Sequence, residues 1–187
     1  MASASVTLDA SIDFNSLDFR LVLFLDFDGV LHPDNCGPHE QFCYVGNFAN
    51  AMRLVDPLHK MPVVISSTWR YLHSLKELRE KFPEDIAAQI VGITSYQTND
   101  ELGPIEDWAT FGGFELKEMH RQLEIMHWMK AHAPQGDWIA IDDRPGFFQK
   151  DESRLFVVPG GPSGGMTTET AMRFFSKVRE ALQKVCT

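Results

Sequence analysis

The chain has 187 residues, of which 44% are hydrophobic and 23% charged, as in ordinary globular proteins. This composition excludes a disordered chain, a collagen-like repeat and a disulfide-dense miniprotein. The formal net charge of −9 does not attract duplex nucleic acid or an anionic membrane. We therefore expect no stable binding of duplex DNA, and a local site must hold any anionic substrate.

The first 20 residues contain three aspartates and no basic residue before Arg20. They lack the basic and apolar regions of a signal peptide, so we interpret residues 1–20 as an N-terminal leader and residues 21–187 as one domain. The three cysteines are an odd and sparse set, which indicates free thiols in a reducing compartment. No apolar run approaches the roughly 20 residues of a membrane span. These features predict a cytoplasmic protein that does not enter membranes, and they leave its oligomeric state open.

Five short apolar runs alternate with helical or irregular stretches. They are residues 21–25, 63–65, 90–93, 138–141 and 155–158. Short runs that are continuously apolar are typical of parallel strands buried on both faces. Their alternation with helices predicts the α/β class, with a three-layer, Rossmann-like open parallel sheet of about five strands and helices on both faces. In such sheets ligands bind beyond the carboxyl ends of the strands.

Three segments have helical patterns. Ser74 and Glu77 form a capping box at the start of a short helix. A second segment repeats apolar residues at steps of three and four, which we interpret as a core face. That face comprises Leu116, Met119, Leu123, Met126 and Met129. The third segment, residues 168–185, is expected to close the fold. Its inward face comprises Met172, Phe175, Val178 and Leu182.

Acidic pairs follow the first and the fourth apolar run. Asp26 and Asp28 flank Phe27, and alternation in extended backbone places both carboxylates on one side. Gly29 then allows a tight turn and a close approach of the backbone to a ligand. Asp142 and Asp143 form the second pair. Such pairs repel unless a cation offsets them, and carboxylates from different strands are ligands that Mg²⁺ prefers.

Hydroxyl and basic residues complete the predicted site. Ser66 and Ser67 follow the second run and could donate to a phosphate oxygen, and Arg70 could pair with an anion. The helix before the fourth run carries Lys117 and Arg121 in its early turns. Because a crossover helix runs against the strands, these turns lie beside the aspartates. Either cation could neutralise a bound phosphoryl group.

Two loop segments carry residue types that are also found in binding sites. The histidines and cysteines His32, Cys36, His39 and Cys43 could hold zinc, but their spacing differs from that of paired-cysteine sites. We favour an irregular flap over the active site, with His32 near the phosphate pocket. The glycine-rich residues 159–165 lack the Lys-Thr pattern of a P-loop, and we interpret them as a loop that leads to the last helix.

Four features of the chain resemble the four motifs of the haloacid dehalogenase-like (HAD) superfamily. They are the segment from Asp26 to Val30, a hydroxyl after the second strand, a basic residue before the fourth strand, and Asp142-Asp143 after the fourth strand. More narrowly, "LFLDFDGVLHP", "VVISSTWR", "WIAIDDRP" and the late "GGMT" resemble the HAD domain of Swiss Army Knife RNA-repair proteins. Arg121 stands where the resemblance expects the third motif, by its position relative to Glu124, Ile125 and Trp128. On this ground we favour Arg121 over Lys117.

The resemblance implies a Mg²⁺-dependent phosphatase that forms an aspartyl-phosphate. Asp26 would attack phosphorus, and Asp28 would protonate the leaving oxygen and later activate water. Mg²⁺ would be bound by Asp26, the backbone carbonyl of Asp28 and Asp142, with Asp143 beside it. The phosphate-binding residues would be Ser66 (with Ser67 as the alternative), Arg121 and Gly29. A second Asp in the first motif fits the dehalogenases of the superfamily poorly.

The inserts between motifs are too short for a full cap domain, so we expect a minimal cap and an open site. The expected substrate is a small-molecule phosphomonoester, such as a nucleotide, or a phosphorylated nucleic-acid end, with a general phosphomonoesterase favoured. The alternative is a catalytically silent phosphate-binding or interaction module on the same fold. A receiver-domain phosphoacceptor fits less well, because the third run ends in Thr94-Ser95 without an acceptor Asp.

Overall fold

A computed structural model describes residues 16–94 and 120–185 of the chain. Within these ranges five strands form one parallel sheet, in the order β3-β2-β1-β4-β5. The strands are β1 (Leu21–Leu25), β2 (Val63–Ile65), β3 (Ile90–Ile93), β4 (Asp137–Asp142) and β5 (Leu155–Val157). Each predicted strand is confirmed to within one residue at either end. The parallel order also confirms the predicted α/β class.

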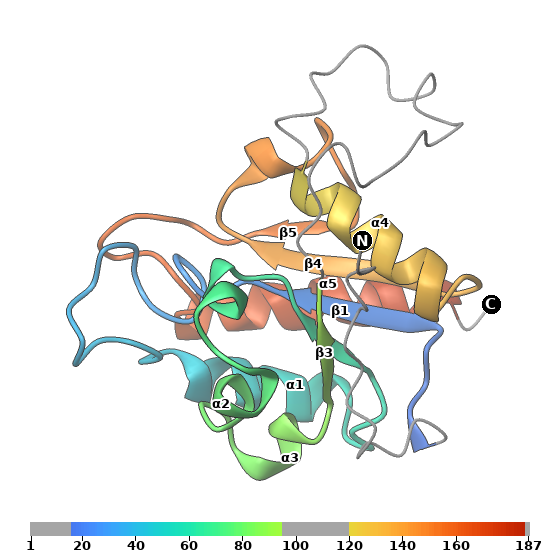
Figure 1. The fold of residues 1–187 in the computed structure, drawn as a ribbon, viewed down its shortest axis with the longest axis horizontal. Helices are drawn as coiled ribbons and strands as arrows, with labels where there is room; N and C mark the ends of the chain where they lie inside the picture. The colour runs from blue at the N-terminus through green and yellow to red at the C-terminus, as the bar shows by residue number, and fades with distance from the viewer. Residues whose placement is uncertain (1–15, 95–119, 186–187) are drawn as a thin grey trace, which may run out of the picture.

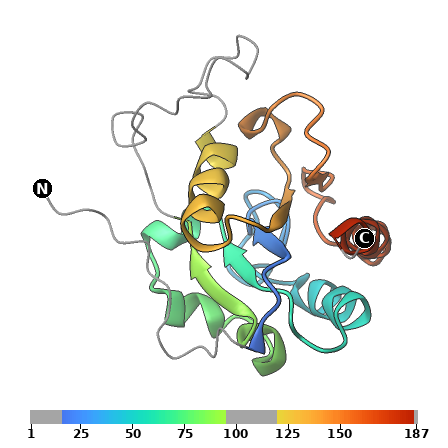
Figure 2. The ribbon, with the colours of Figure 1, turned by 90° about the vertical axis from the view of Figure 1, so that its right-hand side faces the viewer.

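Helices cover both faces of the sheet (Figures 1 and 2). On one face lies α4 (His120–His132). The other face carries α1 (Val45–Val55) and α5 (Thr168–Val185), which pack against each other, and the short helices α2 (Leu75–Arg79) and α3 (Glu84–Ala87). The predicted three-layer arrangement is therefore confirmed. In the described part of the chain, no helix has both the length and the apolar character that crossing a membrane requires.

The central strand β1 is buried on both faces, which explains its unbroken apolar sequence. Leu21, Leu23 and Leu25 join the core beneath α1 and α5, whereas Val22 and Phe24 join the core beneath α4. Successive side chains of a strand point to opposite faces. The next residue, Asp26, therefore has the parity of the α4 face.

Residues 16–20, at the end of the predicted leader, pack against the amino-terminal end of the sheet. Leu17 and Phe19 contact the core on the α4 side. The backbone N–H of Asp18 donates a hydrogen bond of 2.8 Å to the carbonyl of Lys60. The remainder of the predicted leader, residues 1–15, lies outside the described residues.

The inward face of α5 differs from the predicted one. Its buried residues include Ala171, Phe174 and Val178. Met172 was expected to point inward but is 55% exposed, and Phe175 is only half-buried. Two apolar stripes run one residue apart on this helix, and periodicity alone cannot choose between them. The partners decide, because the ring of Phe174 packs on Phe48 and Phe156, with centroids 6.1 and 5.7 Å away.

The capping box of Ser74 and Glu77 is confirmed at the start of α2. On α4, Leu123 and Met129 are buried as predicted and Met126 is half-buried, while Leu116 and Met119 lie outside the described residues. The first turns of α4 also bury polar side chains, which no hydrophobic pattern predicts. These are Arg121, Gln122 and Glu124.

Candidate active site

Strand register brings the motif residues together at the carboxyl edge of the sheet. The pairing of β1 with β4 places Asp26 beside Asp142, each one step beyond the last paired apolar residue. The pairing of β1 with β2 places Ser66 next to Asp26, and the Ser66 N–H donates to the Leu25 carbonyl at 2.9 Å. The register of the parallel strands thus makes neighbours of residues that are far apart in sequence.

Three carboxylates form one cluster at this edge. One oxygen each from Asp26, Asp142 and Asp143 lies within 4.8 Å of the others. Asp26 is 3% exposed and Asp142 is fully buried. Oδ1 of Asp143 is buried and has no hydrogen-bond partner among the described residues. The nearest cation to this oxygen is Nε of Arg144, 3.9 Å away. Because a buried carboxylate oxygen without a hydrogen bond is costly, the donor set fits a divalent cation.

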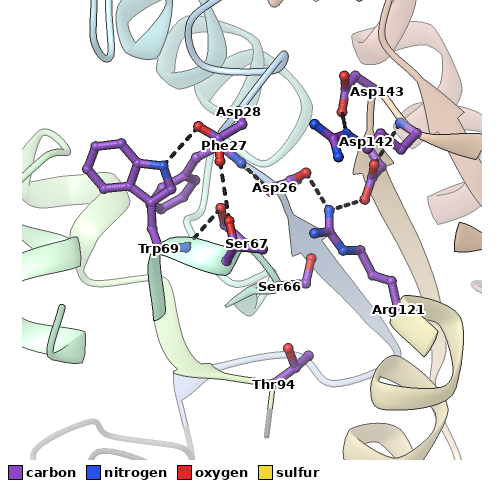
Figure 3. Close-up of polar contacts among 12 residues, drawn as sticks. Asp26, Phe27, Asp28, Ser66, Ser67, Trp69, Thr94, Arg121, Asp142 and Asp143 are labelled. Carbon is purple, nitrogen blue, oxygen red and sulfur yellow. Dashed lines mark hydrogen bonds and ion pairs between the residues drawn. The ribbon is translucent and has the colours of Figure 1, made fainter. Parts of the chain in front are cut away.

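Arg121 bridges two of these carboxylates from the first turn of α4 (Figure 3). Its Nη1 donates to Oδ2 of Asp26 and to Oδ2 of Asp142. Burial works to lower the pKa of the guanidinium, but the two aspartates outweigh it and raise that pKa. Arg121 therefore stays charged inside the protein. The competing candidate, Lys117, lies outside the described residues.

Asp142 and Asp143 bind protons more strongly than ordinary aspartates. Burial, assisted by the charge of Asp26, raises the pKa of Asp142 to about 6. Burial also raises the pKa of Asp143 to about 7, with further contributions from Asp34, Asp142 and Asp26. In the absence of a metal ion, Asp142 and Asp143 therefore hold a proton near neutral pH. Sequence reasoning missed Asp34, whose position in an irregular loop carries no pattern.

Asp28 differs from the alternation that places it on the side of Asp26. Its carboxylate lies outside the cluster and accepts hydrogen bonds at Oδ1 from Nε2 of His32 (3.1 Å) and Nε1 of Trp69 (3.0 Å; Figure 3). The backbone turns at this point and is no longer extended, as the hydrogen bond of 2.8 Å from the Leu31 N–H to the Phe27 carbonyl shows. Sequence reasoning placed His32 only near the pocket and gave Trp69 no role.

Gly29 meets a steric requirement as well as a conformational one. Its φ is +68°, in the left-handed region that disfavours side chains. A Cβ at this position would lie 2.4 Å from Oδ2 of Asp143. The absence of a side chain therefore lets the loop after β1 pass directly against Asp143, the residue that follows β4.

The two candidate hydroxyls after β2 have different surroundings. Oγ of Ser67 accepts the Trp69 N–H at 3.5 Å and caps the 3₁₀ turn Thr68–Tyr71. The Ser66 side chain is buried, and the strand register places Ser66 next to Asp26. Within residues 16–94 and 120–185, no hydrogen bond is formed by its hydroxyl. Ser66 is thus the hydroxyl that is available at the carboxylate cluster.

Arg70 does not face the cluster. Its guanidinium forms a buried ion pair with Glu124, with Nη2 2.8 and 2.7 Å from the two carboxylate oxygens. Its Nη1 donates to the carbonyls of Ser66 and Ser67, both at 2.7 Å. The anion that Arg70 pairs with is therefore internal. This pair connects the strand end that carries Ser66 to the helix that carries Arg121.

The comparison with protein families agrees with this geometry. Residues 22–171 match the family described as the HAD domain in Swiss Army Knife RNA repair proteins. The chain belongs to this HAD family. No curated protein and no solved structure matches the chain. Proteins of the HAD family generally use a divalent metal ion, and the carboxylate cluster is compatible with one.

The zinc hypothesis is not supported in this HAD domain. Among the described residues, the only group of His, Cys, Asp or Glu close enough to share an ion is the aspartate cluster. His32 instead contacts Asp28, and Cys36 and Cys43 are free thiols. The late glycine-rich loop leads to α5 as predicted, and the Met166 N–H after it donates to the Val30 carbonyl at 2.7 Å.

Proposed function

We propose that this HAD domain is a Mg²⁺-dependent phosphomonoester hydrolase that acts through an aspartyl-phosphate on Asp26. The observation that carries the proposal is the shared cluster of Asp26, Asp142 and Asp143, bridged by Arg121. An acidic cluster with one buried cation has the groups that phosphoryl transfer needs: a nucleophile, metal ligands and a positive charge for the phosphoryl oxygens.

The proposed metal ligands are Asp26, Asp142 and the backbone carbonyl of Asp28, with Asp143 beside them. Oδ1 of Asp143, which has no hydrogen-bond partner among the described residues, and the raised pKa values of Asp142 and Asp143 support this assignment. Oxygen ligands of this kind suit Mg²⁺. When bound, the ion would neutralise phosphoryl charge and polarise the phosphorus for attack.

In the first step a carboxylate oxygen of Asp26 attacks phosphorus, and the bond to the leaving oxygen breaks. Asp28 supplies the proton that the leaving oxygen takes. In the second step Asp28 removes a proton from water, the water oxygen attacks phosphorus, and Asp26 is released. Arg121 and the Ser66 hydroxyl stabilise the transferring oxygens, and Gly29 lets the backbone approach them.

Asp28 must change protonation state for this cycle. Its hydrogen bond with His32 is the largest influence and lowers its pKa, so the carboxylate is ionised in the substrate-free protein. This state suits the base of the second step. A phosphoryl dianion beside the carboxylate raises the carboxyl pKa, because like charges disfavour ionisation. Substrate binding thus favours the acid form that the first step uses.

The family and the net charge both bear on the substrate class. The family description names RNA repair proteins, which favours nucleotides or phosphorylated nucleic-acid ends. The net charge of −9 disfavours tight binding of a long duplex. We therefore propose small phosphomonoesters and single phosphorylated ends as substrates. A cytoplasmic location is proposed on the free thiols of Cys36 and Cys43.

Hydrolysis of 4-nitrophenyl phosphate tests the function. We expect turnover with millimolar Mg²⁺ and none after removal of metal by EDTA. Asp142→Ala should lose activity, whereas the matched variant Glu180→Ala, on the exposed side of α5, should keep it. A purified, folded wild type that binds Mg²⁺ but hydrolyses no phosphomonoester would support the catalytically silent module instead. A panel of mononucleotides, sugar phosphates and 5′- or 3′-phosphorylated oligonucleotides then ranks the substrates.

Mg²⁺ should raise the melting temperature, and the increase should grow with pH. Because the pKa values of Asp142 and Asp143 are raised to about 6 and about 7, the metal-free folded state binds protons more tightly than the unfolded state. Its stability therefore falls as pH rises from about 4 to 7. Over the same range Mg²⁺ competes with fewer protons. Binding at a hundred times Kd stabilises by roughly 2.7 kcal/mol. Thermal melts at pH 5 and pH 8 measure both effects. The site is contradicted if Mg²⁺ does not change the melting temperature at pH 8, or if the increase is the same in Asp142→Ala as in the wild type.

A further inference from the structure

Asp28 is held by two N–H groups that converge on one of its oxygens. Nε2 of His32 and Nε1 of Trp69 lie 3.1 and 3.0 Å from Oδ1 (Figure 3 shows the Trp69 contact). Within residues 16–94 and 120–185, the other oxygen, Oδ2, has the Thr68 hydroxyl as its hydrogen-bond partner, at 3.4 Å. The side chain is 39% exposed, so solvent and substrate can reach it. The two oxygens of this carboxylate are therefore not equivalent.

Trp69 is fixed by its neighbours on several sides. Its ring stacks on His73, with centroids 5.2 Å apart and an interplanar angle of 20°. Phe42 and His32 pack against it edge-on, at 5.0 and 5.7 Å. With a face and edges already covered, the indole is poorly placed to stack on a substrate base. Its contact with the catalytic machinery is the N–H that points to Asp28.

His32 is held in the same way. Its side chain is 3% exposed, and its Nδ1 has no hydrogen-bond partner among the described residues. A buried ring nitrogen without an acceptor is cheaper as a lone pair than as an N–H. We therefore assign the ring proton to Nε2, which donates to Asp28.

We propose that Trp69 and His32 are positioning residues that hold Oδ1 of Asp28 as a permanent acceptor and leave Oδ2 as the oxygen that gives and takes the proton. An indole N–H cannot accept a hydrogen bond, so Oδ1 keeps its role in both protonation states. A hydroxyl such as that of Thr68 can donate to an ionised Oδ2 or accept from a protonated one. Oδ2 thus donates a proton to the leaving oxygen and later takes one from water, so that Asp28 ends the cycle in the protonation state in which it began. This inference rests on the proposed phosphatase function.

A pair of esters that differ only in the leaving group tests the proposal. Phenolate has a pKa near 10, as in Tyr, and needs a proton on leaving, whereas 4-nitrophenolate needs one much less. We compare kcat/KM for phenyl phosphate and 4-nitrophenyl phosphate, because this ratio is blind to the later hydrolysis step. Trp69→Phe removes the N–H and keeps a ring. The expected loss is at least about tenfold larger for phenyl phosphate, as a weakened general acid requires.

Two further substitutions separate positioning from packing. His32→Leu should change the ester ratio in the same direction, and His32→Gln, whose amide can donate from a similar place, should restore it. Trp138→Phe makes the same chemical change near the start of β4, at the amino-terminal end of the strands and away from the site. It should leave the ratio of the two kcat/KM values unaltered. Equal losses on both esters, or no loss, in Trp69→Phe and His32→Leu overturn the proposal. If Trp69→Phe does not fold, the comparison of His32→Leu with His32→Gln decides.

A spectrum reads the contact without activity. The four tryptophans give four indole N–H resonances, and the one lost in Trp69→Phe belongs to Trp69. Asp28→Asn should shift that resonance more than the other three. An unshifted resonance overturns the positioning contact itself. If the wild type hydrolyses neither ester but Asp28→Asn shifts the Trp69 resonance, the proposed function is refuted and the Trp69 contact is established.

Discussion

Replacing Asp26 by asparagine is expected to abolish phosphomonoester hydrolysis and to leave the fold intact. An amide is not a nucleophile at phosphorus, so we expect a loss of roughly 10⁴-fold or more in kcat, as for other covalent nucleophiles. The stability should change little. Asp26 loses one of two acceptor contacts, to the Phe27 N–H or to Arg121, but its repulsion of Asp142 disappears. Arg121 keeps Asp142 as its partner.

The measurements are kcat at saturating substrate and the free energy of unfolding without metal, which should change by about 1 kcal/mol or less. Acid-quenched wild type incubated with substrate should carry phosphate on the peptide that contains Asp26, and the variant should not. Asp137→Asn, the same change at the exposed start of β4, is the matched control and should be neutral. Activity of Asp26→Asn within tenfold of wild type would falsify the covalent mechanism.

Arg121→Ala should impair both catalysis and stability. Arg121 is the cation that contacts the buried carboxylates of Asp26 and Asp142. Removing one partner of a buried ionic group typically costs about 3–5 kcal/mol. We expect a loss of this order at pH 8 and a smaller one at pH 5.5, where Asp142 takes up a proton instead. The loss of a charge-stabilising donor should lower kcat by about a hundredfold or more.

Arg121→Lys separates the two roles. Both contacts to the aspartates use the single nitrogen Nη1, so a lysine ammonium can replace them and restore most of the stability. It lacks the second guanidinium nitrogen for a phosphoryl oxygen, so kcat should recover only in part. Lys130→Ala, at the exposed end of α4, controls for loss of helix charge. If Lys117→Ala has the low kcat and Arg121→Ala is near normal, the assignment of the third motif is wrong while the family stands.

Several features of the protein were predictable because local sequence determines them. A strand buried on both faces requires an unbroken apolar run, so β1 could be located to the residue. Acidic pairs directly after such strands are costly without a cation, which identified Asp26, Asp142 and Asp143 as candidates. The direction of a crossover helix placed the first turns of α4 at the same edge. The contact of Arg121 with Asp26 and Asp142 confirms that placement.

Other features depend on contacts between distant segments. The face that α5 turns inward was mispredicted at Met172, because Phe48 and Phe156 select Phe174 from two adjacent stripes. The ion pair of Arg70 with Glu124 joins residues 54 apart in the chain. No spacing rule connects them, and either residue alone has many solvated counterparts in other sequences.

Asp28, the proposed acid–base residue, shows most clearly how far local sequence can predict the site. Its place after β1 and before Gly29 made Asp28 a candidate for the site. Where its carboxylate points follows from a turn and from Trp69, 41 residues away, which together draw it out of the cluster of Asp26. Composition and periodicity therefore determined the sheet and the chemical types at its edge. Only the tertiary structure decided which of those groups touch, because hydrogen-bond partners are set by strand register and side-chain packing rather than by separation along the chain.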